Sequence, residues 1–304
     1  MGKASMDAVT PREVILCEVG PRDGFQYEEA VIPTDLKVEV VRGLAAAGLP
    51  RIQVASFVHP RKVPQMADAE EVVARLADVE GVTLSGLALN RKGVERARAS
   101  GLRAVDISIA TWDDHSLENA GMTVDEAVEQ AAEMVATARE AGMEVQVGLQ
   151  TVFGFRKPGD TPVERVVGLV KRFVRLGVDS ISLADTTGMA GPVSIASRVE
   201  AVRRVAGDVP IVLHLHDTRG LGMANVYEGI RCGVDRFDTA FGGMGGCPFI
   251  RGAAGNVPTE DTVHLLASLG ISTGVDIAGV ANVTHRVADH LQKDLPGRMY
   301  RLFD

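Results

Sequence analysis

Residues 144–183, EVQVGLQTVFGFRKPGDTPVERVVGLVKRFVRLGVDSISL, contain one complete strand–helix–strand unit. The β-branched run 144–151 predicts a strand, and the amphipathic stretch 162–176 predicts a helix. Gly177 follows the expected end of that helix, and a second strand is expected over 180–183. A strand, a helix and a further strand in this order predict two parallel strands of one sheet.

The same alternation extends along the rest of the chain. Eight strands are predicted, at residues 14–19, 51–56, 82–89, 104–109, 144–151, 180–183, 211–216 and 236–240. Eight strands that alternate strictly with helices are what a closed parallel barrel requires. A doubly wound open sheet is the alternative, but it favours a linker between two halves, and the sequence has no Pro/Ser-rich or charged linker. We therefore predict an α/β fold, a TIM (β/α)8 barrel, in a single domain over residues 1–304.

The segments between the strands predict the helices of the barrel. Examples are 34–47, 69–76, 124–141, 162–176, 193–205 and 221–232. Thr34, Thr123 and Thr161 are the expected N-caps. Residues 257–269 can supply the eighth outer helix, and 276–293 predict an additional C-terminal helix, which we expect to pack over the rim. Residues 1–12 are expected to be a flexible N-terminus.

Composition excludes several classes of partner. The formal net charge is -8 and no block of Lys and Arg is present, which argues against a nucleic-acid partner. No apolar run approaches the roughly 20 residues of a membrane span, and residues 1–12 lack the apolar core of a signal peptide. Three cysteines cannot form a full disulfide framework, so we expect a soluble, cytoplasmic protein. Cys17 and Cys232 are expected to be small core residues.

Polar residues at the ends of the predicted strands are the candidates for chemistry, because reactive groups in such barrels lie just past the carboxyl ends of the strands. Arg22 and Asp23 follow the first strand between glycines, where a sharp turn can project both side chains over the barrel mouth. Asp23 can bind a hard divalent cation, and Arg22 can hold a developing oxyanion. The alternative is an Asx-type turn with a solvated arginine.

The seventh strand carries two histidines, His214 and His216, two residues apart. Residues at this spacing face the same side of a strand, so both can bind one metal ion. A single strand histidine is more often a core residue, but two at a strand exit favour a functional pair. Asp217 could orient one of the rings.

A glycine-rich loop, 242–246, follows the eighth strand and leads to Cys247. A cysteine in such a loop indicates a proton donor or base that loop closure brings to the site, although a flexible connection or phosphate cradle is the alternative. Asn256 offers an amide oxygen that could complete a shell of Asp, His, His and Asn, a set that suits Mg²⁺ or Mn²⁺. Asp185, at the exit of the sixth strand, could accept a proton or cap the following helix.

Six stretches resemble the hydroxymethylglutaryl-CoA lyases of the DRE-TIM metallolyase superfamily, in the same order over nearly the whole chain. They are EVGPRDGFQ (18–26), SFVHPRKVPQMAD (56–68), SLADTTG (182–188), HLHDTRG (214–220), GGMGGCPF (242–249) and GAAGNVPTED (252–261). The superfamily's condensing enzymes, such as isopropylmalate synthase, share the Arg-Asp and His-x-His elements but carry a long additional C-terminal domain.

The resemblance implies a metal-dependent cleavage of a 3-hydroxy acyl-CoA into acetyl-CoA and a keto acid, in leucine degradation. It implies a divalent metal, Mg²⁺ or Mn²⁺, as cofactor and an acyl-CoA as the small-molecule partner. The implied metal ligands are Asp23, His214, His216 and Asn256. Arg22 would stabilise the enolate, Asp185 would lie beside the reacting hydroxyl, and Cys247 would transfer a proton. The resemblance implies His214 among the catalytic residues too, and a homodimer or higher homo-oligomer is possible.

The chain departs from the family pattern in three places. Glu29 replaces a lysine that helps to hold the substrate, and Gln53 replaces a glutamate. The fifth-strand exit has Gln150, Phe153 and Phe155, and the two phenylalanines could shape a different acyl pocket.

We expect Arg22, Gln26, Gln53 and Gln150 to contact substrate. We also expect the substitution Gln53→Glu to raise activity on hydroxymethylglutaryl-CoA. A related 3-hydroxy-3-alkyl acyl-CoA and a hydroxy-keto acid aldolase reaction are the alternatives, and a non-catalytic barrel is disfavoured.

Overall fold

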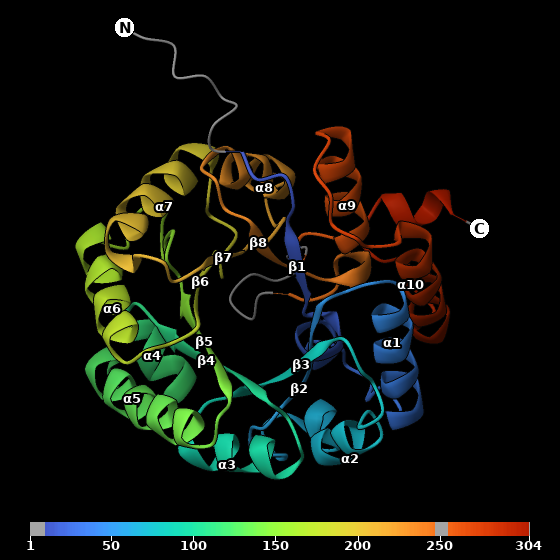
Figure 1. Ribbon diagram of the computed structural model, residues 1–304, viewed down its shortest axis with the longest axis horizontal. Helices are drawn as coiled ribbons and strands as arrows, with labels where there is room; N and C mark the ends of the chain where they lie inside the picture. Colours follow the sequence, from blue (N-terminus) through green and yellow to red (C-terminus); the bar gives the residue numbers. More distant parts are fainter. Residues whose placement is uncertain (1–9, 247–254, 304) are drawn as a thin grey trace, which may run out of the picture.

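Eight parallel strands form a closed barrel in the computed structural model of the chain, which describes residues 10–246 and 255–303 (Figure 1). The strands are β1 (Ile15–Glu18), β2 (Arg51–Ser56), β3 (Thr83–Ala88), β4 (Ala104–Ala110), β5 (Glu144–Gln150), β6 (Ser180–Ala184), β7 (Ile211–His214) and β8 (Arg236–Thr239). β1 pairs with both β2 and β8, which closes the sheet. The barrel predicted from the sequence is confirmed.

Helices surround the barrel. They are α1 (Thr34–Ala46), α2 (Ala69–Ala74), α3 (Arg91–Ala99), α4 (Asp113–Ala120), α5 (Val124–Glu140), α6 (Val163–Arg175), α7 (Pro192–Ala206), α8 (Gly222–Arg231), α9 (Thr259–Ser268) and α10 (Ile277–Leu291). Their apolar faces pack on the outside of the strands, as Val166, Val170 and Phe173 of α6 do. No helix in the described ranges is long and apolar enough to cross a membrane.

Two of the three expected helix caps are wrong, because a proline takes the capping position. Thr123 does cap α5, through a reciprocal capping box with Glu126. The N-caps of α1 and α6 are instead Pro33 and Pro162, whose ring fixes φ at −58° and −62°. The Thr161 hydroxyl donates a hydrogen bond to the Thr151 carbonyl at 2.6 Å and so contributes to a loop contact rather than a cap.

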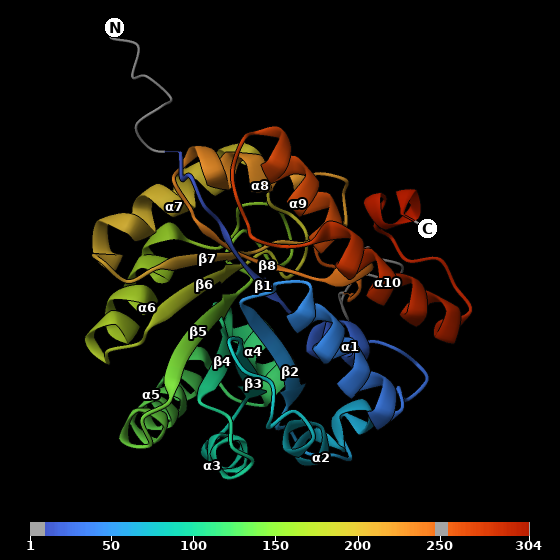
Figure 2. The same ribbon diagram turned by 45° about the vertical axis from the view of Figure 1, so that its right-hand side comes forward.

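The C-terminal helix α10 takes a place in the outer ring rather than over the rim. It contacts both α1 and α9 and lies between them (Figures 1 and 2). It also contacts η4 (Phe241–Gly243), the 3₁₀ turn that follows β8. The helix therefore packs against the turn before Met244, whose carbonyl accepts a hydrogen bond from Asn256.

Polar side chains lie inside the barrel. Alternate strand residues point inward, and at these positions lie the buried side chains of Gln53, Asp106, Gln146, Ser182 and Asp238. Buried polar groups need partners, and these side chains form hydrogen bonds with other polar side chains inside the barrel.

Candidate metal centre and reaction cavity

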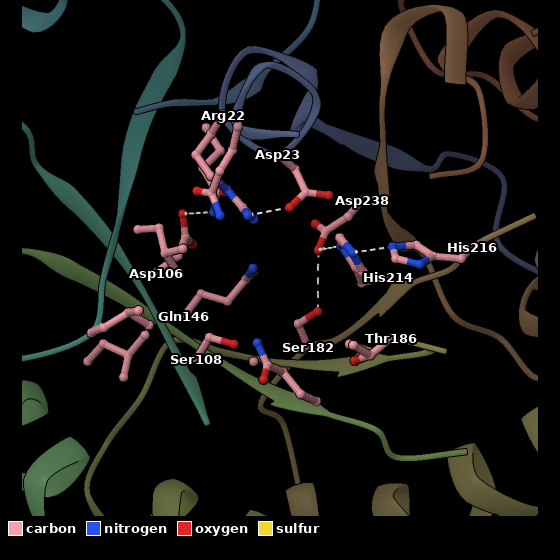
Figure 3. Close-up of a pocket in the computed structure, with 18 of the residues that line it drawn as sticks. Arg22, Asp23, Asp106, Ser108, Gln146, Ser182, Thr186, His214, His216 and Asp238 are labelled. Atoms are coloured by element: carbon pink, nitrogen blue, oxygen red, sulfur yellow. Dashed lines mark hydrogen bonds and ion pairs between the residues drawn. The ribbon is translucent and has the colours of Figure 1, made fainter. Parts of the chain in front are cut away.

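A cavity of about 160 Å³ lies at the carboxyl ends of the strands. The lining side chains that Figure 3 labels are all polar or charged. Its walls include Arg22, Asp23, Asp106, Gln146, Ser182, His214, His216 and Asp238. These residues come from six different strands or strand exits, which is typical of a reaction site in this fold.

Arg22 and Asp23 lie in η2 (Gly20–Gly24), a single π-helical turn directly after β1. The flanking glycines are required for space rather than for an unusual φ. A Cβ on Gly20 would lie 2.6 Å from the Phe241 ring, and one on Gly24 would lie 2.7 Å from Met244 Cβ. Close packing against the loop after β8 therefore holds the Arg-Asp turn over the barrel mouth.

His214 and His216 turn their rings toward each other, with 3.3 Å between the two Nε2 atoms. Two nitrogens that bind one ion at roughly 2.1 Å lie about 3 Å apart, so this spacing fits a shared cation. One ligand atom from each of Asp23, His214 and His216 lies within 4.8 Å of the others. These three residues form a group that can hold a divalent metal.

The protonation states of Asp23 and His216 suit a metal. Burial lowers the pKa of His216 to about 4, which leaves its imidazole neutral and able to bind. Burial opposes ionisation of Asp23, but Arg22 and the two histidines outweigh it and lower the pKa of the carboxyl. The ring of His214 is also disfavoured as a cation by burial, yet Asp238 and Asp23 raise its pKa overall.

Asn256 completes the group from the far end of the chain. It forms an isolated antiparallel bridge with His216, and its Nδ2 donates to Asp23 Oδ2 at 2.7 Å and to the Met244 carbonyl at 3.0 Å. The side chain is 1% exposed, and Oδ1 has no hydrogen-bond partner in the described part of the chain. An unpartnered buried oxygen beside a carboxylate and two imidazoles fits a cation ligand.

Asp238 orients His214, whereas Asp217 does not. Asp238 Oδ2 lies 3.1 Å from His214 Nδ1, and the two residues are register partners on β7 and β8. Asp217 Oδ1 instead accepts a hydrogen bond from Gly222 N at 2.7 Å, at the start of α8. The expectation for Asp217 is therefore wrong. Asp238 lies in the strand predicted over 236–240, and an acidic residue inside a strand was the sequence feature that could have identified it as the partner of His214.

Asp185 caps a turn with one oxygen and leaves the other without a partner. Oδ1 accepts from Met189 N at 2.8 Å and Ala190 N at 3.0 Å, before the start of α7. Oδ2 is buried and has no hydrogen-bond partner among the described residues. Burial raises the pKa of this carboxyl to about 7. Asp185 is not among the residues that line the cavity, although its neighbours Ala184 and Thr186 are.

The model of the HMGL-like family matches residues 13–287. This chain belongs to the HMGL-like family. It is 33% identical over 96% of its length to the hydroxymethylglutaryl-CoA lyase YngG of Bacillus subtilis, of which it covers 98%. It is 36% identical over 96% of its length to the (R)-citramalyl-CoA lyase of Chloroflexus aurantiacus, covering 93% of that protein.

Two further comparisons bear on length and structure. The chain is 35% identical to the mitochondrial hydroxymethylglutaryl-CoA lyase of Arabidopsis thaliana over 92% of its own length, and it spans 60% of that longer relative. A structure of an HMG-CoA lyase from Acinetobacter baumannii, in complex with coenzyme A and 3-methylmalate, matches with a TM-score of 0.90 and 34% identity. That match covers 95% of each chain.

Three glutamines expected at the substrate site of this HMGL-like protein all line the cavity. Gln26 and Gln150 each have a buried Oε1 without a hydrogen-bond partner in the described ranges. Gln53 is fully engaged, since it accepts from Arg22 Nε and donates to Asp106 Oδ2 at 2.6 Å. The first two can therefore accept a hydrogen bond from a ligand, whereas Gln53 links Arg22 to Asp106.

Other residues singled out from the sequence do not line this cavity. Phe153 is buried in the core, and Phe155 stacks on His115 with ring centroids 5.2 Å apart, so neither shapes the pocket as expected. Glu29 is exposed and lies off the cavity wall. Cys247 lies outside the described residues, and its role stays a prediction. Of the other two cysteines, Cys17 is buried and Cys232 is only half-buried.

Proposed function

We propose that the chain is a divalent-metal-dependent carbon–carbon lyase, which cleaves a 3-hydroxy-3-methylglutaryl-CoA-like thioester to acetyl-CoA and acetoacetate. The observation that carries the proposal is the group of Asp23, His214 and His216 beside Arg22 in one cavity. Membership of the HMGL-like family and the names of its relatives support the same reaction.

Asp23, His214, His216 and Asn256 would hold the ion, either Mg²⁺ or Mn²⁺. When bound, the ion would acidify the substrate's tertiary hydroxyl and fix its orientation. Asp238 supports this arrangement, because its hydrogen bond to Nδ1 of His214 directs the opposite ring nitrogen toward the site.

The protein's own residues would handle the charge and the protons of the reaction. When the bond between C2 and C3 breaks, negative charge develops on the thioester oxygen, and the guanidinium of Arg22 can donate charge-assisted hydrogen bonds to it. Arg22 is held ready by Gln53 and Asp23, which accept from its Nε and Nη1. Asp185 would receive the hydroxyl proton, with a pKa near neutrality that suits proton transfer, and Cys247 would return a proton to the enolate carbon.

A second cavity of about 540 Å³ adjoins the first and shares Gln26, Leu87, Leu89, Ile107 and Ser108 with it. Its walls are largely apolar, and His59 and Lys62 lie among them. We propose that this cavity takes the arm of the thioester, with Lys62 available for a phosphate. The coenzyme A in the Acinetobacter neighbour supports an acyl-CoA as the small-molecule partner.

A second candidate substrate is another 3-hydroxy-3-alkyl acyl-CoA, such as (R)-citramalyl-CoA. The similarity to the Chloroflexus lyase favours keeping it. We further propose a homo-oligomer and a cytoplasmic location, since three cysteines are too few for a disulfide framework and fit a reducing compartment.

The test is a panel of 3-hydroxyacyl thioesters incubated with Mg²⁺ or Mn²⁺ and analysed by mass spectrometry. The proposal expects acetyl-CoA and acetoacetate from hydroxymethylglutaryl-CoA, and loss of both products in His214→Ala. Pyruvate and acetyl-CoA from citramalyl-CoA, at a higher kcat/KM, would assign the second substrate. Turnover of a free hydroxy-keto acid with no thioester cleavage would contradict the proposal and indicate an aldolase.

A further inference from the structure

A row of polar side chains crosses the inside of the barrel and ends at Arg22. It begins at Glu144, whose Oε1 accepts a hydrogen bond from Arg51 Nη1 at 2.6 Å. Arg51 Nη2 donates to Asp106 Oδ1 at 3.1 Å, and Gln53 Nε2 donates to Asp106 Oδ2 at 2.6 Å. Gln53 Oε1 in turn accepts from Arg22 Nε. Asp106 is therefore joined to Arg22 through a single amide.

The two neighbours of Gln53 fix which way its amide points. A guanidinium can only donate hydrogen bonds, and an ionised carboxylate can only accept them. An amide has one end of each kind, so Gln53 satisfies both when its oxygen faces Arg22 and its nitrogen faces Asp106. Gln53 is 3% exposed and Asp106 is 4% exposed, so water does not compensate for a wrong orientation.

The carboxylate of Asp106 is itself held in place. Ser85 Oγ donates to Oδ2 at 2.6 Å, in addition to the bonds from Arg51 and Gln53. Asp106 and Arg22 both line the reaction cavity (Figure 3). Asp106 thus carries a negative charge that is held in place, and it is linked to Arg22 through the hydrogen bonds of Gln53.

We propose that Asp106 is a positioning residue for Arg22, which it orients through the Gln53 amide. It carries the carboxylate that the resembling lyases usually carry at the position of Gln53. This inference rests on the proposed function, in which Arg22 stabilises the charge on the thioester oxygen. One carboxylate can occupy either of the two positions, but not both. The earlier expectation for Gln53→Glu is thereby reversed, since a second carboxylate would lie within hydrogen-bond distance of Asp106.

Four proteins test the proposal: the wild type, Gln53→Glu, Asp106→Asn, and the double variant that exchanges carboxylate and amide. Gln53→Glu places two carboxylates together. Asp106→Asn removes the negative charge and turns an amide nitrogen toward a group that now donates to Asp106, either Arg51 or the pair Gln53 and Ser85. Each change therefore disturbs the row that ends at Arg22. In the double variant, the carboxylate at position 53 accepts from both Arg22 and the new amide. For each protein kcat, KM, Mn²⁺ affinity and the thermal midpoint are measured with hydroxymethylglutaryl-CoA as substrate.

We expect each single variant to lower kcat by at least about 10-fold, because a misplaced catalytic group is costly. Mn²⁺ affinity should stay within about 3-fold of the wild type, since Asp106 does not contact the metal group. The double variant should recover kcat to within about 3-fold of the wild type. If the two sites were independent, their fold-losses in kcat would multiply in the double variant. A double variant with that larger loss would overturn the proposal.

Glu144→Gln is the matched control, because it alters the same row at the end away from Arg22. Its kcat should stay within about 2-fold of the wild type, because the Glu144 side chain is 39% exposed and Arg51 keeps its own bond to Asp106. A loss as large as that of Asp106→Asn would indicate general damage to the barrel interior and contradict a positioning role. If the wild type cleaves no thioester, the proposed function fails separately. The thermal midpoints then still decide the pairing: recovery in the double variant supports it, and additive losses refute it.

Discussion

The arrangement of single side chains around His214 decides which residues can hold an ion. The ring of His214 is fixed by Asp238, and Ser182 Oγ donates to the same carboxylate oxygen at 3.3 Å. Because Nδ1 is engaged by Asp238, Nε2 is the nitrogen left to face His216. Groups that orient a metal-binding histidine in this way usually contribute to affinity without contacting the ion.

Replacing Asp238 by Asn should therefore weaken Mn²⁺ binding by about 10–100-fold. Titration of the metal-free protein, followed by the electron paramagnetic resonance signal of free Mn²⁺, measures this. Asp217→Asn is the control, because Asp217 contacts the backbone of Gly222 instead of a ring, and its Mn²⁺ affinity should be unchanged. Equal losses in the two variants would contradict the role of Asp238.

The carboxyl of Asp185 should make stability depend on pH in the metal-free protein. Burial raises its folded-state pKa from 3.8 to about 7, so the folded protein holds a proton that the unfolded chain releases. The stabilisation is fully present below the unfolded pKa and is lost as the pH rises through about 7. Thermal midpoints of chelator-treated wild type should thus fall between pH 5 and pH 8. Asp185→Asn should show a smaller fall, and an identical fall in both proteins would argue against the shifted pKa.

The site could be predicted from the sequence only where chemistry depends on local position. Asp23, His214 and His216 stand at strand exits, and the barrel brings such exits together whatever the register. Asp238 and Asp106 lie within strands, and their partners depend on how the barrel closes. Asp238 of β8 lies beside His214 of β7, and Asp106 of β4 accepts a hydrogen bond from Gln53 of β2. Contacts of this kind are set by tertiary geometry rather than by any motif.

At the scale of elements, strand and helix boundaries were predicted to within a few residues because hydrophobic periodicity is a local signal. The position of α10 was not, since nothing in an amphipathic helix states which neighbours cover its apolar face. One polar contact of α10 shows how it is joined to its neighbours. Thr284 of α10 donates a hydrogen bond to the buried Glu260, which also accepts from Gly242 N at 3.0 Å. This bond couples α10 to the turn after β8.

Thr284→Val should destabilise the protein by about 1–3 kcal/mol, because it removes a donor from a buried carboxylate without changing the size of the side chain. Urea unfolding monitored by circular dichroism gives the free energy of unfolding. Thr284→Ser keeps the hydroxyl and should lose much less. If the serine variant is as unstable as the valine variant, packing of the methyl group explains the effect, and the hydrogen bond does not.

For the molecule as a whole, the candidate metal ligands connect the first strand with the last two. Asp23 follows β1, whereas His214, His216 and Asn256 come after residue 210, and β1 and β8 pair to close the barrel. An ion at this point would join both ends of the sheet. Binding to the folded state alone raises stability by mass action.

Addition of Mn²⁺ at about 100 times its dissociation constant should stabilise the folded protein by roughly 2.7 kcal/mol. The thermal midpoint measured with and without the ion reports this gain. His216→Ala should show almost none of it. A variant that gains as much as the wild type would place the stabilising ion elsewhere.

The most direct measurement is anomalous diffraction from crystals of the protein soaked in Mn²⁺. We expect one dominant anomalous peak at roughly 2.0–2.3 Å from a carboxylate oxygen of Asp23, Nε2 of His214 and of His216, and Oδ1 of Asn256. A dominant peak outside this group, or no peak within bonding distance of the two histidines, would contradict this expectation.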